Sequence, residues 1–173
     1  MDISRGSMIH TFEDLSHWSK RFFKMAIETG SWSKDEKHKI GCIIVNNDHI
    51  VLSGGFNGFP RGVEDDDRLL YKNRDIKNRL IVHAEANAIV SAARIGHSLM
   101  NGVLYCTQPP CSSCAGLIIQ AGITKVYFFS NTTLHWADSI KIAKQMFEEA
   151  GIEYLEVDSI IKVDYNLSTN SAT

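Results

Sequence analysis

The sequence predicts an α/β sandwich built on a mixed sheet. Three observations lead to this prediction: two apolar strands come early in the chain, helices and strands alternate after them, and the length suits a single domain. The chain has 173 residues, of which 44% are hydrophobic and 22% charged, an ordinary balance for a globular protein with a core. Strands that alternate with helices favour a sheet covered by helices.

The first predicted elements are a helix and a pair of strands. Apolar residues recur at helical spacing across residues 12–28, and we expect Gly30 to end this helix. The β-branched run Ile40–Val45 and the segment Ile50–Leu52 predict a two-stranded hairpin. Glycines, a proline and an acidic run predict a loop at 54–67.

The rest of the chain alternates between helices and strands. We expect Gly96 and Gly151 to follow the ends of two of the helices. Cys42 and Cys106 fall in apolar strands and are predicted to be small core residues. The predicted helices cover 83–95, 112–121 and 138–150, and the predicted strands cover 102–106, 125–129 and 152–157.

One domain is expected at residues 9–160. Residues 5–8 (Arg-Gly-Ser-Met) resemble an expression-vector scar, so 1–8 is predicted to be a disordered tag remnant, and 161–173 a polar, loose tail. No apolar run reaches the roughly 18–20 residues that span a bilayer, which predicts no membrane partner. Four cysteines without a secretory signal favour reduced thiols and a cytoplasmic location.

The charge balance bears on the class of substrate. The formal net charge is −2, whereas nucleic-acid binders usually carry a basic face. An editor of tRNA or single-stranded DNA would also need a basic channel lined with stacking aromatics. Nucleic acid is therefore not the expected partner, while a small anionic substrate needs only a few donors.

Two short motifs supply a predicted zinc site. They are His83-Ala84-Glu85 and Pro110-Cys111-Ser112-Ser113-Cys114. A catalytic zinc takes three protein ligands and keeps a fourth position for water, and His83, Cys111 and Cys114 supply those three. Each motif opens a predicted helix, whose positive end favours thiolate over thiol. We therefore predict one catalytic Zn²⁺ per chain.

Glu85 is the predicted catalytic residue. At the entry of its helix, its carboxylate can reach a zinc-bound water, whose pKa the metal lowers to about 7. It would take the proton of this water and pass it to a ring nitrogen before ammonia leaves. A lone C-x-x-C fits a redox pair or a structural zinc knuckle, but H-x-E with P-C-x-x-C is the signature of zinc deaminases.

Four sequence blocks carry a family resemblance. They are Gly55–Pro60 (G-[YFW]-N-G-x-P), Ile81–Ile89 (H-A-E-x-N-A-I), Pro110–Ala115 and Ile118–Ile123. With them the chain resembles the deoxycytidylate (dCMP) deaminases over residues 18–157. The resemblance implies the cytidine deaminase-like fold, a three-layer α/β/α sandwich with a mixed five-stranded sheet. It also implies hydrolysis of the C–N bond of dCMP to give dUMP and ammonia, a step of pyrimidine nucleotide metabolism.

The resemblance further implies substrate-binding residues. Asn57 would bond the sugar hydroxyl, although an Asn-Gly turn also explains this residue, and the backbone at Ala84 would accept from the amine of the base. The other expected substrate-binding residues are Pro110 and the phosphate-binding set Ser33, Lys34 and Lys39. Solvation of a charged loop explains the two lysines equally well.

The insertion before the H-A-E block stays open. Its acidic run 64–67 is typical of a solvated loop, but in this family the insertion can shape the mouth of the site or hold a deoxynucleoside triphosphate effector. Four cations there could serve anionic groups: Arg61, Arg68, Arg74 and Lys77. By the resemblance, the chain also forms a homo-oligomer, either a dimer or a hexamer.

The chain departs from the family pattern in two places. The additional Cys and His residues that build a second zinc site in eukaryotic and T-even phage-like relatives are missing. The stretch 134–139 matches the usual Y-H-D-S imperfectly, and its His135 and Trp136 could approach the substrate or pack in the core. Alternatives that stay open are a deaminase of CMP, 5-modified dCMP, a free nucleoside or a nucleobase, and a non-catalytic zinc-binding interaction module.

Overall fold

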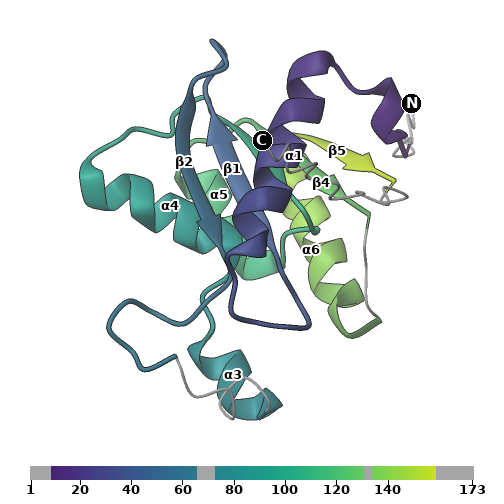
Figure 1. Cartoon of the computed structure of the whole chain (residues 1–173). Coiled ribbons are helices and arrows are strands. Elements are labelled where there is room, and N and C mark those ends of the chain that lie inside the picture. Colours follow the sequence, from purple (N-terminus) through teal and green to yellow (C-terminus); the bar gives the residue numbers. More distant parts are fainter. Residues whose placement is uncertain (1–8, 66–72, 131–133, 159–173) are drawn as a thin grey trace, which may run out of the picture.

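The computed structural model describes residues 9–65, 73–130 and 134–158. Within them, five strands form one mixed sheet in the order β2-β1-β3-β4-β5 (Figure 1). This confirms the predicted α/β fold and its mixed five-stranded sheet. The strands are β1 (Gly41–Val45), β2 (Val51–Phe56), β3 (Val103–Cys106), β4 (Lys125–Phe129) and β5 (Glu153–Val157).

Helices and short 3-10 turns connect these strands. The longest is α1, which begins after Ser16, whose side chain accepts from the backbone N–H of Ser19 at 3.1 Å. Among the described helices, none has the length and apolar character needed to cross a bilayer. The helical elements are η1 (Phe12–Asp14), α1 (His17–Ser31), α3 (Arg74–Leu80), α4 (Ala84–Ile95), α5 (Ser112–Gln120), η2 (Leu134–Trp136) and α6 (Ala137–Glu149).

The sheet is antiparallel at one side and parallel at the other. β1 pairs antiparallel with both β2 and β3, whereas β3, β4 and β5 are parallel. The parallel strands are joined through α5 and α6, as crossover connections require. All five residues of β1 are buried, as expected of a strand covered on both faces.

Two apolar clusters fill the space on either side of the sheet. On one face α1 packs with Phe22, Phe23 and Ala26. On the other face α4, α5 and α6 pack over a cluster that includes Cys42 and Cys106. These two cysteines are register partners on β1 and β3 and are fully buried, which confirms their prediction as core residues.

Gly30 does not end the first helix, contrary to the sequence prediction. α1 continues through it to Ser31. A Cβ atom at Gly30 would lie 2.8 Å from the backbone nitrogen of Gly41 at the start of β1, closer than real Cβ contacts come. This glycine is therefore a point of close approach between helix and strand rather than a helix stop.

The loop predicted from Gly54 begins later than expected. β2 continues through Gly54 and Gly55 to Phe56, because α4 lies directly against this part of the strand. A Cβ at Gly55 would come within 2.5 Å of the carbonyl oxygen of Ala84. The contact holds the first turn of α4 against the sheet.

The sequence analysis missed one helix. α3 begins after Asn73, whose side chain accepts from the backbone N–H of Ile76 at 3.2 Å. None of its seven residues is buried, and Figure 1 shows it set off from the sheet on the side where β2 ends. The predicted tag remnant at 1–8, Arg68 and the tail 161–173 lie outside the described residues, so those predictions and the domain limits stay predictions.

Replacing Gly55 by alanine should destabilise the fold. The added methyl group would overlap the backbone of α4, and overpacking of this kind costs about 1–3 kcal/mol. The matched control is Gly116→Ala in α5, where the nearest atom would be Met146 Cε at 3.8 Å. Alanine there should keep or raise stability by up to about 1 kcal/mol. Urea unfolding of both zinc-loaded variants measures the difference, and equal stability would contradict the close packing.

Candidate active site

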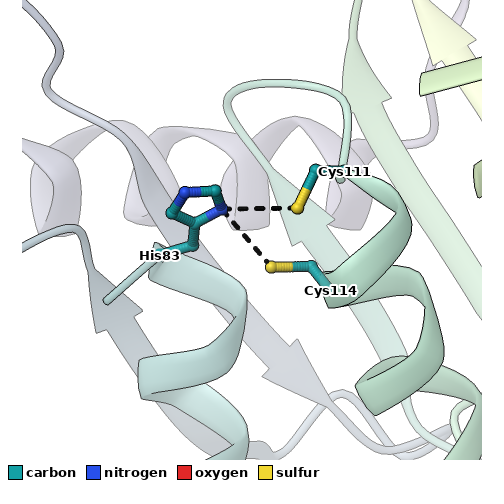
Figure 2. Close-up of side chains that lie close together, drawn as sticks. All are labelled: His83, Cys111 and Cys114. Carbon is teal, nitrogen blue, oxygen red and sulfur yellow. Dashed lines mark hydrogen bonds between the residues drawn. The ribbon is translucent and has the colours of Figure 1, made fainter. Parts of the chain in front are cut away.

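The three predicted zinc ligands lie at the beginnings of two helices. His83 is the N-cap of α4, and Cys111 is the N-cap of α5. Cys114 is the third residue of α5. The prediction that each motif opens a helix is therefore confirmed, and both helix beginnings meet at the three side chains (Figure 2).

The spacing of these side chains fits a zinc ion. Nδ1 of His83 lies 3.5 Å from Sγ of Cys111 and 3.5 Å from Sγ of Cys114 (Figure 2). With Zn–S of about 2.3 Å and Zn–N of about 2.0–2.1 Å, a tetrahedral centre places nitrogen and sulfur about 3.5 Å apart. Among the His, Cys, Asp and Glu side chains of the described residues, these three have ligand atoms that lie close enough to share a metal.

The cluster favours a thiolate. Hydrogen bonds from Cys114 and His83 lower the pKa of Cys111 to about 4. The same contact with Cys111 raises the pKa of the His83 imidazole. Next to this thiolate, and buried, the Cys114 thiol has a raised pKa. Thiolates are the form that binds zinc, so Cys111 is ready to bind the metal, whereas binding through Cys114 releases its proton.

Glu85 is the second residue of α4, and its side chain is buried. Only 4% of it is exposed, and burial raises the pKa of its carboxyl to about 7. It lines the same cavity as His83 and Cys111. A buried carboxyl beside a metal cluster but outside the ligand set is available to exchange protons with a bound molecule.

The cluster borders a cavity of about 370 Å³, which has the size of a small-molecule site. Its walls come from the segment before β1 (residues 35–40), from α3, from the starts of α4 and α5, and from η2. The lining residues are Asp35, Lys37, His38, Ile40, Asn57, Arg74, Lys77, Asn78, Ile81, His83, Glu85, Gln108, Pro109, Cys111, His135, Trp136 and Ile140.

Asn57 lines this cavity and also holds its wall. Its Oδ1 accepts from the backbone N–H of Ile40 at 2.9 Å, and its Nδ2 donates to the carbonyl of His38 at 2.7 Å. Only 2% of it is exposed. Its side chain therefore fixes the segment before β1, a function that an Asn-Gly turn alone would not require.

The expected phosphate-binding residues lie outside the cavity lining. Lys34 pairs with Oδ1 of Asp65 at 2.7 Å, and Lys39 donates to the carbonyl of Ser31 at 3.1 Å. The hydroxyl of buried Ser33 donates to the carbonyl of Asn57 at 2.7 Å. Ala84 and Pro110 are fully buried and, like Arg61, are not among the lining side chains.

His135 and Trp136 reach the cavity rather than the core. The Trp136 ring meets the His83 ring edge to face, with centroids 5.6 Å apart. Three residues later, Ser139 Oγ accepts from the backbone N–H of Ser112 at 3.0 Å, which ties α6 to the beginning of α5. The stretch that departs from the family pattern therefore forms one wall of the site.

Sequence reasoning missed several lining residues. Lys37 and His38 stand in a charged segment with no recognisable motif, and Gln108 lies in the loop before the cysteines. Arg74 and Lys77 were named as cations that could serve an anion, and both line the cavity. The N-cap residue Asn73, with Asp75 in the first turn, is the sequence signal that could have placed the last two on one helix.

A family model covers two thirds of the chain. Residues 16–130 match the cytidine and deoxycytidylate deaminase zinc-binding region. The chain belongs to this deaminase family. The matched region includes the zinc cluster, Glu85 and Asn57, so the family assignment and the site geometry agree on a zinc-binding centre.

Individual relatives cover most of this deaminase. An uncharacterized deaminase from the luxG 3′ region of Aliivibrio fischeri is 42% identical over 142 residues, 80% of this chain and 92% of that protein. Human deoxycytidylate deaminase is 32% identical over 92% of this chain and 91% of its own length. The structure of dCMP deaminase from the cyanophage S-TIM5, in complex with dCMP and dUMP, is 30% identical with a TM-score of 0.64, over 79% and 94% of the two chains.

Replacing a cysteine of the cluster should remove the metal. Cys114→Ala deletes one of three protein ligands and should weaken zinc binding by more than about 100-fold, since loss of an outer partner of a ligand already costs 10- to 100-fold. Chelator competition and metal analysis measure this. Cys106→Ala, a buried cysteine outside the cluster, should bind zinc as the unchanged protein does. Equal zinc content in the two variants would contradict the assignment.

Proposed function

We propose that this chain is a zinc-dependent hydrolase that converts dCMP and water to dUMP and ammonia. The observation that carries the proposal is the buried Glu85 carboxyl in the same cavity as a His/Cys/Cys cluster with tetrahedral zinc spacing. A structural zinc site has no use for such a carboxyl. The dCMP- and dUMP-bound structure of the related cyanophage deaminase supports the choice of substrate.

The residues of the site divide the chemistry between them. A zinc ion held by His83, Cys111 and Cys114 would polarise water and make it nucleophilic at neutral pH. Glu85 accepts the proton of the attacking water and transfers it to the ring nitrogen next to the carbon that bears the amine. It then takes the remaining proton of the hydroxyl added to that carbon and delivers it to the departing amine, so that the C–N bond breaks, the carbonyl of dUMP forms and ammonia leaves.

Residues beyond the zinc centre would contact the sugar and the base of the substrate. We propose that Asn57 bonds the sugar hydroxyl at the cavity wall through the Nδ2 hydrogen or the Oδ1 lone pair that its bonds to His38 and Ile40 leave over. The backbone at Ala84 would accept from the amine of the base, beside Pro110. Because their polar atoms are used within the protein, Ser33, Lys34 and Lys39 would support the phosphate-binding wall rather than contact the phosphate.

The remaining parts of the proposal concern assembly and location. Family resemblance supports a homo-oligomer, either a dimer or a hexamer, and a deoxynucleoside triphosphate effector at the insertion before α4, part of which lies outside the described residues. All four cysteines are free thiols in the structure, which supports a cytoplasmic, reducing location.

A deamination assay followed by ultraviolet absorbance tests the proposed reaction. We expect turnover of dCMP, and Glu85→Gln should lower kcat by about 10²–10⁴-fold, because an amide cannot transfer the protons. Zinc content should be unchanged in this variant, since Glu85 is outside the ligand set. CMP, 5-methyl-dCMP, deoxycytidine and cytosine are assayed in parallel.

Each result of the assay decides between the alternatives. Activity restricted to deoxycytidine or cytosine would keep the zinc chemistry and reject a nucleotide substrate. If the zinc-loaded protein turns over none of these compounds, the result would favour a non-catalytic zinc-binding module. Unchanged dCMP turnover in Glu85→Gln would overturn the role of this carboxyl.

A further inference from the structure

α3 borders the cavity although it contributes nothing to the core. None of its residues is buried, yet Arg74, Lys77 and Asn78 line the cavity. A helix of seven residues has little stability of its own. Its position must therefore depend on specific contacts with the rest of the protein, and one contact stands out.

An ion pair between Asp35 and Lys77 joins α3 to the segment before β1. Lys77 Nζ lies 2.6 Å from Oδ2 of Asp35, and the two side chains are 12% and 3% exposed. Oδ1 of Asp35 accepts from the backbone N–H groups of Lys37 and His38 at 3.0 and 3.2 Å. Burial raises the pKa of Asp35, but these donors outweigh it and hold that pKa below its usual value.

This pairing determines which cations are left for a ligand. Asp35 and Lys77 neutralise each other. In the part of the chain that the structure describes, neither Lys37 nor Arg74 forms an ion pair, and both line the cavity together with His38. Two cations without acidic partners beside one cavity suit a phosphate group, and the fork of an arginine binds phosphate through two hydrogen bonds.

The segment that carries Lys37 is also connected to the zinc end of the cavity. Asn57 bonds the backbone of His38 and Ile40 on this segment. Gly58, the next residue, forms a β-bridge with Val82 directly before His83. A ligand held by Lys37 and Arg74 is thereby positioned by the same backbone that leads to the metal cluster.

We propose that α3 is a phosphate-recognition arm: Arg74 and Lys37 contact the 5′-phosphate of the nucleotide, and the Asp35–Lys77 ion pair holds the arm in place. Lys77 is a positioning residue in this scheme, since its charge is already used by Asp35. The inference rests on the proposed nucleotide substrate. It moves phosphate recognition from Lys34 and Lys39 to residues whose charges remain free.

Calorimetric binding of dUMP and of deoxyuridine tests the arm without requiring turnover. Arg74→Ala should weaken dUMP binding by about 10- to 100-fold, the loss expected for a charge-assisted pair of hydrogen bonds. Deoxyuridine, which has no phosphate, should bind both proteins alike. The matched control is Arg79→Ala on the same helix, because Arg79 does not line the cavity and its removal should leave dUMP binding within twofold.

Lys77 is tested separately as a positioning residue. Lys77→Met should weaken dUMP binding and raise the KM for dCMP by about 10- to 100-fold, because a displaced arm misplaces Arg74. Lys77→Arg, which can still pair with Asp35, should recover most of the affinity. A purely structural role would instead weaken deoxyuridine binding and zinc content to the same extent.

The outcomes separate this inference from the proposed reaction. If the unchanged protein deaminates dCMP, but the affinity of Arg74→Ala for dUMP is within twofold of the unchanged protein's affinity, the arm is wrong and the reaction stands. If the unchanged protein binds dUMP through Arg74 yet never deaminates dCMP, the reaction is wrong and the phosphate arm stands. If dUMP binds no better than deoxyuridine to the unchanged protein, the arm is overturned.

Discussion

The whole site depends on one geometric constraint, the convergence of two helix beginnings at one edge of the sheet. His83 precedes α4 and Cys111 precedes α5, and His83 Nδ1 lies 3.5 Å from the sulfurs of both Cys111 and Cys114. That spacing persists because both helices pack on the same face of the sheet through a shared apolar core. The helix end at Cys111 also favours a thiolate there, since the pKa of Cys111 is lowered to about 4, so the fold contributes to both the distances and the charge of the site.

Hydrogen bonds extend this constraint from the metal cluster to the far wall of the cavity. Asn87 on α4 donates to the carbonyl of Phe56 at 2.7 Å, which fixes the end of β2. The next residue, Asn57, bonds the backbone of His38 and Ile40. Because each of these donors and acceptors is buried or partly buried, loss of one partner leaves an unsatisfied polar group. The cavity is therefore a hydrogen-bonded unit whose two ends cannot move independently without cost.

The sequence predicted the parts of the structure that local pattern decides. Ligand type, spacing and helix entry are all local, which is why the zinc cluster and the two helix beginnings were predictable. Gly30 and Gly55 were misread as breaks, because the sequence shows a missing side chain but not the backbone that lies against it. The helix at Arg74–Leu80 was missed because it is short and exposed, and two apolar residues, Ile76 and Leu80, are too few to establish a helical period.

Charged residues show this limit most clearly, because their function depends on which partners folding gives them. Lys34, Lys37 and Lys39 lie within six positions of one another, and nothing in their spacing ranks them as phosphate ligands. In the folded chain Lys34 pairs with Asp65 and Lys39 binds backbone carbonyls, so either would have to give up a bond before gaining one from a ligand. A cation without such a partner, like Lys37 or Arg74, gains the full interaction. Anion recognition is thus assigned to the cations that remain after the fold has satisfied the others, and in this protein they border the cavity that also holds the zinc cluster.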